Sequence, residues 1–210
     1  MFDSQKELAV ALSRLKVLQD PKVKAEQYQT SSEIAAEILW NAKMKGDIEN
    51  KVIADFGAGN GIFGIGASLL GAKGIYFIEN EKDALKILKW NVEFTNKDIA
   101  PLPNTRVLNS DVRRFEIPCE VVIQNPPFGT KEKHADQIFL RAAFATAPIV
   151  YSFHKESTLS YVKRYSNEMN YEVTDLFRID FPIKKTQKFH KKPKVDVKTV
   201  CVRMKKLPLE

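Results

Sequence analysis

Residues 125–128 read Asn-Pro-Pro-Phe and directly follow the apolar run Val121-Val122-Ile123. Pro126 and Pro127 remove two backbone donors and fix φ near about −65° at both positions, and the first proline favours an extended Asn125. In such a rigid loop the Asn125 side chain and the Pro126 carbonyl can accept both N–H groups of a planar amine, and Phe128 can stack on it. This motif predicts a site for an amine conjugated to a ring, or for an amide nitrogen. A turn that only ends a strand would use the same residues, so a second motif has to decide.

The second motif is glycine-rich and reads Asp55-Phe56-Gly57-Ala58-Gly59-Asn60-Gly61. Glycines allow a tight turn and a close approach of ligand and backbone at a helix N-terminus, but such a loop alone could also serve NAD or FAD. The Asp55 carboxylate would repel a phosphate and attract a sulfonium and an α-amino group. Glu79 ends the next apolar run, at about the twenty-residue spacing typical of an acid that binds ribose hydroxyls. These features predict S-adenosylmethionine as the cofactor.

A third candidate is Asp111, which follows the third predicted strand and could bind the adenine amine of the cofactor. A turn or N-cap aspartate would look the same in the sequence. In an open α/β sheet, ligands bind beyond the carboxyl ends of the strands, where the strand order reverses. The loops at 55–61 and 125–128 follow the first and fourth predicted strands, so both are expected there. We therefore predict a methyl donor held by one loop beside an amine held by the other.

The elements that must position these loops are apolar strands that alternate with helical stretches. This alternation predicts a mainly parallel sheet covered by helices on both faces. No helix separates the last two strands, so they are expected to form an antiparallel pair at one end. The predicted strands are 51–56, 74–79, 105–109, 120–124, 149–153, 171–181 and 194–204. The predicted helices are 4–18, one opened by the capping-box sequence Thr30-Ser31-Ser32-Glu33, and 62–70, 81–95, 135–146 and 156–169.

The composition is that of an ordinary globular domain, with 210 residues and 44% hydrophobic content. We expect one domain over residues 1–210, with a helical cover at 1–46 and a catalytic α/β core at 51–210. No apolar run reaches the roughly 18 residues of a membrane span, and the N-terminus lacks the regions of a signal peptide. Cys119 and Cys201 lack a Cys-x-x-Cys spacing, which argues against disulfides and zinc and favours a cytoplasmic location. We expect surface or hydrogen-bonding roles, not metal ligation, for His134, His154 and His190.

Basic residues are concentrated near the C-terminus. Residues 184–206 hold ten Lys or Arg and one acid, so this segment carries +9, the other residues sum to −2, and the chain totals +7. A patch of this density favours a polyanion, most simply nucleic acid. A solubilising tail is the alternative, although apolar residues within the segment argue against pure disorder. We predict that the basic loop at 184–194 binds nucleic acid through Lys184, Lys185, Lys188, Phe189, His190, Lys191 and Lys192.

Beyond these motifs, the chain resembles the small-subunit ribosomal RNA adenine-N6 methyltransferases of eukaryotes and archaea, the methyltransferase-like five family. The resemblance covers nearly the whole length and implies a Rossmann-like class I methyltransferase fold with a seven-stranded sheet. The most specific shared pieces are the Gln-Tyr-x-Thr sequence at 27–30 and the Phe-His-Lys-Lys sequence at 189–192. The others are Glu7-Leu8, Ser13-Arg14-Leu15, Pro21-Lys22, Asn50-Lys51-Val52, Ala54-Asp55, residues 125–131, Tyr151-Ser152-x-His154-Lys155 and Val195-Asp196.

The resemblance assigns roles to further residues. Those near the N-terminus cover the cofactor, the glycine loop lines it, Glu79 binds the ribose, and Asp111 with Val112 binds the adenine. Positions 58 and 60 are Ala and Asn where the family often has Cys, and Glu79 replaces the more usual Asp. Backbone groups act at positions 58 and 60, so cofactor binding is still expected. The implied cofactor residues are Gln27, Tyr28, Thr30, Asp55, Gly57, Gly59, Asn60, Gly61, Ile62, Glu79, Asp111 and Val112.

The predicted function is methyl transfer from S-adenosylmethionine to an adenine N6 in structured RNA, most simply small-subunit ribosomal RNA. The base has to leave its stack to reach the pocket. Two other functions stay open. Methylation of a glutamine side-chain amide in a protein would also use a planar nitrogen, and a non-catalytic assembly factor would bind ribosomal RNA through the basic loop alone. The resemblance also implies a partner, because eukaryotic relatives work with a small zinc-binding activator protein.

Overall fold

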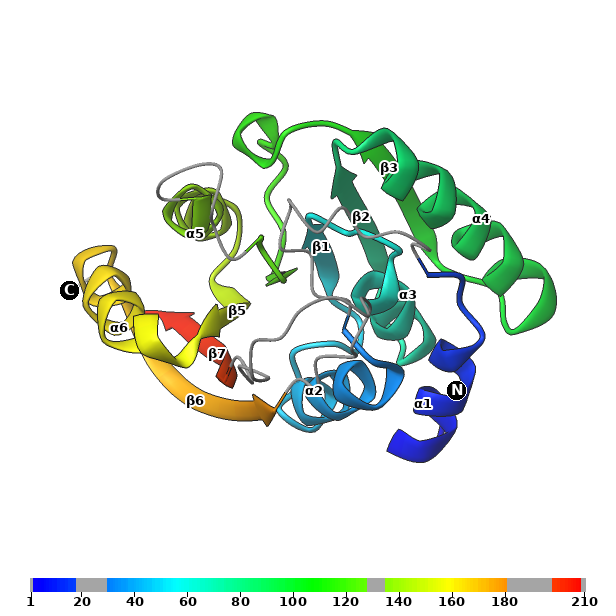
Figure 1. The fold of residues 1–210 in the computed structure, drawn as a ribbon, viewed down its shortest axis with the longest axis horizontal. Coiled ribbons are helices and arrows are strands. Elements are labelled where there is room, and N and C mark those ends of the chain that lie inside the picture. Colours follow the sequence, from blue (N-terminus) through cyan, green and yellow to red (C-terminus); the bar gives the residue numbers. More distant parts are fainter. Residues whose placement is uncertain (1, 18–29, 128–134, 181–197, 209–210) are drawn as a thin grey trace, which may run out of the picture.

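The computed structural model describes residues 2–17, 30–127, 135–180 and 198–208. The chain begins with two helices and continues as alternating strands and helices (Figure 1). The strands are β1 Val52–Phe56, β2 Gly74–Glu79, β3 Asn104–Asn109, β4 Val121–Gln124, β5 Ile149–Lys155, β6 Tyr171–Asp180 and β7 Lys198–Lys206. The helices are α1 Gln5–Ser13, α2 Ser32–Met44, α3 Ile62–Leu69, α4 Lys82–Asp98, η2 Val112–Arg114, α5 Ala135–Thr146, η3 Glu156–Thr158 and α6 Leu159–Glu168.

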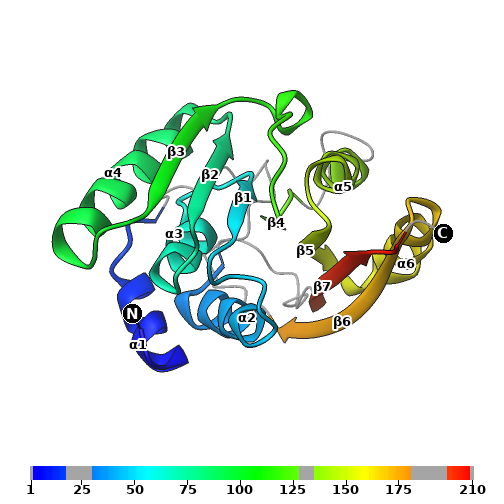
Figure 2. The same cartoon turned by 180° about the vertical axis from the view of Figure 1, so that it is seen from behind.

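The strands form one seven-stranded sheet in the order β3-β2-β1-β4-β5-β7-β6. β1 to β5 are parallel, whereas β7 pairs antiparallel with both β5 and β6. Figure 2 shows the same sheet from behind, running from β3 at one edge to β6 at the other. The predicted α/β fold with a C-terminal antiparallel pair is therefore confirmed.

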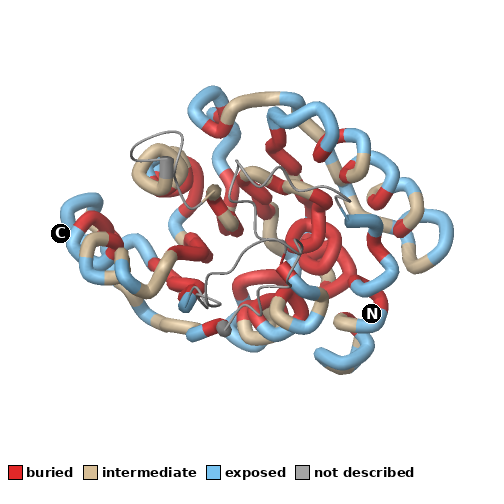
Figure 3. Tube along the Cα trace, in the orientation of Figure 1, coloured by how far each residue is buried: buried red, intermediate tan, exposed pale blue. Residues whose placement is uncertain are grey.

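Helices cover both faces of the sheet. One buried cluster joins α1, α2, α3 and α4 to one face, and a second joins η2, α5 and α6 to the other. Alternate residues of the central strands supply the two clusters, for example Ile53 and Ala54 on β1, both fully buried. Figure 3 shows the buried core along the central strands and exposed turns at the periphery. The central strands are therefore held rigidly, and so are the loops that leave their carboxyl ends.

Three predicted helices differ from the structure, and one of them, expected over 81–95, continues to Asp98. The helix expected over 4–18 ends at Ser13, and the backbone N–H and carbonyl of Lys16 instead bind the Asn91 side chain, at 2.8 and 3.0 Å. The helix expected over 156–169 begins with a 3₁₀ turn and becomes α-helical at Leu159. The last strand continues to Lys206 instead of Met204, and residues 181 and 194–197 of the predicted pair lie outside the described residues. None of the described helices is both long and apolar enough to cross a membrane.

Candidate active site

The two sequence motifs follow neighbouring strands. β1 and β4 are adjacent and parallel, and Phe56 is paired with Gln124 at their ends. Gly57 and Asn125 are the next residues of these two strands, so the donor loop, defined as residues 55–61, and the acceptor loop, residues 125–127, leave the sheet side by side. The order of strands reverses at this point, since β2 and β3 lie on one side of β1 and β4 on the other. Ligands of open α/β sheets bind at such a position.

Backbone conformation shapes the donor loop. Gly57, Gly59 and Gly61 have φ of +65°, +58° and +85°, a region that only glycine adopts readily. A Cβ atom on Gly61 would lie 2.5 Å from Leu88 Cδ1, whereas one on Gly59 would meet only the Gly57 carbonyl oxygen, at 3.9 Å. Gly61 is thus required for packing as well as for conformation, and Gly59 for conformation alone.

Asp55 connects β1 to the start of α3. Gly61 occupies the N-cap of α3 and offers no side chain there. The buried Asp55 carboxyl group caps the helix instead, because its Oδ2 accepts a hydrogen bond from the Gly64 N–H in the first turn of α3, at 2.9 Å. Burial raises the pKa of Asp55 to about 8; the Gly64 hydrogen bond opposes this rise, and the negative charge of Glu79 adds to it. The end of β1 therefore presents a buried carboxyl group whose charged form is stabilised by the Gly64 hydrogen bond but by no ion pair in the described part of the chain.

Glu79 ends β2 and holds the donor loop from its other side. Its Oε2 accepts from the Gly59 N–H at 2.8 Å, and its Oε1 accepts from the backbone N–H groups of Asn80 and Glu81, each at 2.8 Å. The side chain is 6% exposed. Oε1 thus accepts two hydrogen bonds, whereas Oε2 accepts one described bond and keeps a second lone pair for a further donor. Within the described part of the chain, neither Glu79 nor Asp55 forms an ion pair.

A buried amide cluster ties the donor loop to the N-terminal segment. Asn91 on α4 donates from Nδ2 to the carbonyls of Asn60, at 2.7 Å, and Lys16, at 3.0 Å. Asn60 Nδ2 donates to the same Lys16 carbonyl at 3.1 Å. The Lys16 ammonium lies 3.6 Å from the centre of the Trp90 ring. The Asn60 side chain, predicted to line the cofactor, is therefore engaged with Lys16, and its backbone belongs to the loop.

The acceptor loop is held through its side chain. Asn125 Nδ2 donates to Thr30 Oγ1 at 3.1 Å. Thr30 is buried, as is Pro126, and Asn125 and Pro127 are half-buried. The cap of α2 is Ser31, which accepts from the Ile34 N–H. The capping-box expectation is thus wrong in its register, since the third helical position holds Ile34 and not an acid.

Asp111 lies after β3, as predicted, and already has a partner. Its carboxylate accepts from the Arg113 backbone N–H at 2.9 Å and from the Arg113 guanidinium at 2.9 and 2.6 Å. This hydrogen bonding with Arg113 lowers the pKa of Asp111 despite partial burial. Asp111 therefore caps η2, the role that the sequence left open as the alternative, and its binding of adenine stays a prediction. Val112 and Ile62 are both buried beside these loops.

Comparisons with known proteins identify the family. The chain matches the methyltransferase small domain over residues 14–190. It is 35% identical to the rRNA N(6)-adenosine-methyltransferase METTL5 of Danio rerio, over 94% of this chain and 97% of that protein. The chain belongs to the METTL5 family. A crystal structure of the same size, PH1948 from Pyrococcus horikoshii, has a TM-score of 0.83 at 37% identity and covers 97% of this chain and 98% of that one.

The cofactor of this METTL5-family protein is S-adenosylmethionine, as predicted. Its fold is that of magnesium protoporphyrin IX methyltransferase from Synechocystis with bound SAH, at a TM-score of 0.66, 8% identity and 82% and 81% coverage. The donor set of the loop suits such a group. Asp55 and Glu79 supply two carboxyl groups that no described cation neutralises, and a bound cation would favour the charged form of Asp55, whose pKa burial raises to about 8. This donor set favours a ligand with a positive charge and hydroxyl donors over a phosphate.

Some predicted site residues of this METTL5-family chain lie outside the described residues. They are Gln27, Tyr28, Phe128, Lys184, Lys185, Lys188, Phe189, His190, Lys191 and Lys192. Their roles stay predictions.

Sequence reasoning missed two features of this METTL5-family site. It did not single out Asn91, although a polar residue on the apolar face of α4, in phase with Leu88 and Thr95, was a usable signal. It also expected His154 at the surface or in a hydrogen bond. His154 is 1% exposed, its Nε2 has no partner in the described structure, and burial lowers its pKa to about 3. His154 is therefore a neutral core side chain.

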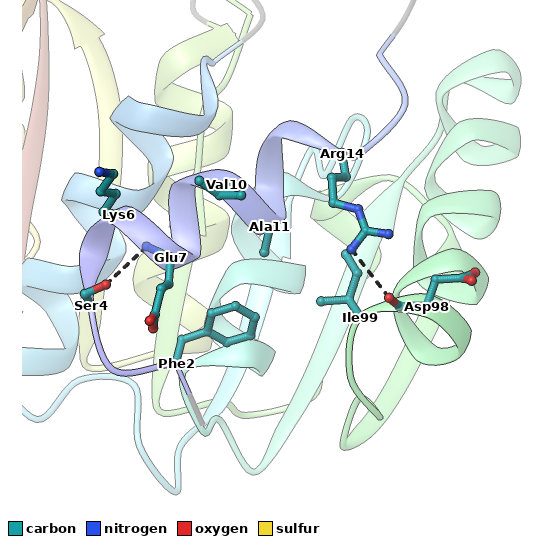
Figure 4. Close-up of a pocket in the computed structure, with 9 residues that line it drawn as sticks. All are labelled: Phe2, Ser4, Lys6, Glu7, Val10, Ala11, Arg14, Asp98 and Ile99. Carbon is teal, nitrogen blue, oxygen red and sulfur yellow. Dashed lines mark hydrogen bonds between the residues drawn. The ribbon is translucent and has the colours of Figure 1, made fainter.

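A separate hollow is lined by no residue of the donor or acceptor loop. It has a volume of about 550 Å³ and is lined by residues of the α1 region and the end of α4 (Figure 4). α4 begins close to the carboxyl end of β2, beside the donor loop, and runs away from it. Asp98 and Ile99, at its other end, therefore lie towards the amino ends of the parallel strands. Arg14 closes one side by donating to the Asp98 carbonyl at 3.5 Å. The hollow brings together none of the predicted site residues.

Proposed function

We propose that this METTL5-family protein transfers a methyl group from S-adenosylmethionine to the N6 amine of an adenine in ribosomal RNA, with residues 1–210 acting as one catalytic domain. The observation that carries this proposal is the register of β1 and β4, which places the acceptor loop directly beside the donor loop. The Danio rerio relative is named an rRNA N(6)-adenosine-methyltransferase, which supports ribosomal RNA as the substrate and N6 as the methylated position.

The cofactor residues act from both sides of the donor loop. Asp55 attracts the positive end of the cofactor, Glu79 accepts from the ribose hydroxyls, and the glycines allow the backbone to approach. Asp111 and Val112 hold the adenine end, with Gln27, Tyr28 and Thr30 covering the cofactor. When bound, S-adenosylmethionine supplies an electrophilic methyl group. The carboxyl groups of Asp55 and Glu79 support this assignment, because a nearby positive charge would favour the ionised form of the buried Asp55 and the ribose hydroxyls can donate to Glu79.

The acceptor loop presents the amine. Asn125 Oδ1 and the Pro126 carbonyl accept its two N–H groups, which turns the nitrogen lone pair towards the donor loop. Phe128 stacks on the base after it has left the RNA stack. Positioning and exclusion of water account for most of the rate effect. A strong general base is unnecessary, because an alkylated amine loses its proton readily.

The RNA is held outside the pocket by the basic loop. Lys184, Lys185, Lys188, Lys191 and Lys192 contact phosphates, and Phe189 and His190 contact a flanking base. Binding of this kind weakens steeply with salt because counterions are released from the RNA. We also propose a cytoplasmic location and a small zinc-binding activator protein as partner, both supported by the family resemblance.

The decisive experiment is incubation with labelled S-adenosylmethionine and ribosomal RNA, followed by nucleoside analysis. We expect N6-methyladenine as the product. Asn125→Ala should abolish methylation while calorimetry still detects cofactor binding, and the matched control Asn104→Ala, at an exposed position of β3, should stay active. Formation of N2-methylguanine would contradict the adenine assignment. A methylated glutamine, with substrate binding insensitive to salt, would replace RNA by protein as the substrate.

A further inference from the structure

Two residues from distant parts of the chain meet at the acceptor loop. Asn125 Nδ2 donates to Thr30 Oγ1 at 3.1 Å, across 95 residues of sequence. Thr30 is 6% exposed. Its hydroxyl is not used to cap α2, because Ser31 accepts from the Ile34 N–H. The Thr30 hydroxyl is therefore available as an acceptor for the Asn125 amide.

An amide side chain has two ends of opposite hydrogen-bonding character. The nitrogen only donates and the oxygen only accepts, and the two lie on opposite sides of Cγ. A bond from Nδ2 to Thr30 turns Oδ1 of Asn125 to the other side. The N6 amine of adenine presents two N–H donors, so it needs the oxygen. If Nδ2 lay in the place of Oδ1, its N–H groups would face the N–H groups of the adenine amine, and no hydrogen bond could form.

We infer that Thr30 is a positioning residue for methyl transfer, which selects the rotamer of Asn125 that presents Oδ1 to the acceptor amine. The inference rests on the proposed function and adds to it the reason why Asn125 turns its amide oxygen, and not its amide nitrogen, towards the acceptor amine. The Thr30 hydroxyl accepts from Asn125 and keeps its own proton for a further acceptor. The same side chain can thus contact the cofactor and orient Asn125.

Thr30 is itself firmly placed. It precedes α2, whose residues Ala36 and Leu39 are fully buried against α1 and α3. Just after the other end of α2, Asp47 accepts from Tyr151 Oη at 2.6 Å and from Arg203 Nε at 2.7 Å. These bonds join α2 to β5 and β7. Because β5 pairs with β4, the support of Thr30 and the strand that carries Asn125 belong to one packed unit.

Thr30→Val gives a direct test, since valine keeps the shape of threonine and removes the acceptor. The substitution removes the acceptor that holds Nδ2 on the Thr30 side, so the Asn125 amide should rotate more readily and place Nδ2 where Oδ1 is needed. The experiment uses the full chain with ribosomal RNA and measures kcat, KM and the calorimetric Kd for S-adenosylmethionine. Thr30→Val should lower kcat about tenfold or more, which corresponds to about 1.4 kcal/mol.

Two further variants make the result specific. Thr30→Ser restores a hydroxyl and should recover kcat to within about threefold of the wild type. Thr146→Val is the matched control, because Thr146 is 7% exposed and its hydroxyl binds only the Ala142 carbonyl of its own helix. It should leave kcat unchanged. If Thr30→Val fails to fold, Thr30→Ala removes the same acceptor without adding atoms and is read in the same way.

The outcomes separate this inference from the proposed function. A kcat for Thr30→Val within about twofold of the wild type would overturn the inference, and so would a loss confined to cofactor affinity. A serine variant as slow as the valine variant would overturn it too. If the wild type methylates a nitrogen other than adenine N6, the proposed function fails, and the same variants, measured on that product, still decide the role of Thr30.

Discussion

The donor loop and the acceptor loop lie side by side but are held in different ways. In the donor loop, many bonds use backbone groups: the Gly59 N–H binds Glu79, the Asn60 carbonyl binds Asn91, and three glycines have positive φ. The Asp55 and Asn60 side chains add bonds to Gly64 and Lys16. In the acceptor loop, a side chain makes the described bond, between Asn125 and Thr30. The donor loop thus depends on the path of the chain, and the acceptor loop on the identity of a few side chains.

This difference separates stability from turnover. A change in the donor loop disturbs backbone conformation and buried groups, so it should first lower the free energy of unfolding. A change at the half-buried Asn125, or at its buried partner Thr30, removes a side-chain contact rather than a backbone conformation, so it should first lower kcat. The same fold can therefore retain S-adenosylmethionine as the methyl donor, while substitutions of a few side chains in the acceptor loop change which amine is methylated. The following variants test this separation, from the largest expected effect to the smallest.

Asp47→Ala tests whether the buried bonds of Asp47, which join α2 to β5 and β7, stabilise the fold rather than support turnover. Asp47 is 3% exposed and receives bonds from Tyr151 and Arg203. Its removal leaves the Arg203 charge buried without this carboxylate, which should lower the free energy of unfolding by about 3–5 kcal/mol in urea denaturation. The control Glu168→Ala removes an exposed ion pair with Arg164 and should cost less than about 1 kcal/mol.

Equal losses in these two variants would show that the buried pair contributes no more than a surface pair. A loss confined to kcat in Asp47→Ala would contradict the separation more directly. In that case the buried network would act on Asn125 rather than on the fold.

Gly61→Ala and Gly59→Ala compare two glycines of the donor loop. Both have positive φ, but only at Gly61 would the added methyl group strike a neighbour, Leu88, at 2.5 Å. Gly59→Ala should therefore cost about 1 kcal/mol from conformation alone. Gly61→Ala should cost about 2–4 kcal/mol, because overpacking adds to the strain. Thermal and urea unfolding of both variants would measure the difference, and similar losses would show that Leu88 moves aside without cost.

Much of this arrangement could be predicted from the sequence, for reasons that are local. The central strands are short continuous apolar runs, and parallel strands place their following loops at one edge of the sheet. The meeting of the donor and acceptor loops could therefore be predicted without any measured distance. The roles of single side chains were less accessible. Thr30 and Ser31 are equally good caps by composition, and only the structure shows that Ser31 caps α2.

Long-range pairs were the part that sequence reasoning could not reach. Asn91 contacts Lys16, 75 residues away, and Asn125 contacts Thr30, 95 residues away. No periodicity links such positions, because the contact depends on how α1, α2 and α4 pack on the sheet. The early end of α1 has the same origin, since the Asn91 amide replaces helical bonding at Lys16.

Asn91→Leu tests whether the amide cluster supports the donor loop. Leucine keeps the volume but leaves the Lys16 N–H and the carbonyls of Lys16 and Asn60 without the Asn91 amide. The expected cost is about 2 kcal/mol in the free energy of unfolding, with weaker cofactor binding by calorimetry. Asn96→Leu on the exposed side of α4 is the control and should cost less than about 1 kcal/mol. Unchanged cofactor affinity in Asn91→Leu would show that the donor loop does not depend on this cluster.

Asp55→Asn gives the smallest effect near neutral pH and separates stability from binding within the donor loop. The carboxyl group of an exposed Asp ionises around pH 3.8, whereas burial raises the pKa of folded Asp55 to about 8. The folded state therefore binds more protons between these values, and the wild type loses stability as the pH rises towards about 8 and no further above it. Asparagine keeps an acceptor for the Gly64 N–H and does not ionise.

The stability of Asp55→Asn relative to the wild type should therefore increase by about 1 kcal/mol between pH 7 and pH 9, since only the last pH unit below the pKa of about 8 is crossed. Its affinity for S-adenosylmethionine relative to the wild type should fall over the same range, because only the wild type gains the attracting negative charge. Melting curves and calorimetry at both pH values measure the two effects. A variant that is more stable yet binds less would show that the donor loop retains Asp55 for its ligand at a cost to the fold. A stability difference independent of pH would show instead that Asp55 is already ionised at pH 7 and that burial does not hold its proton.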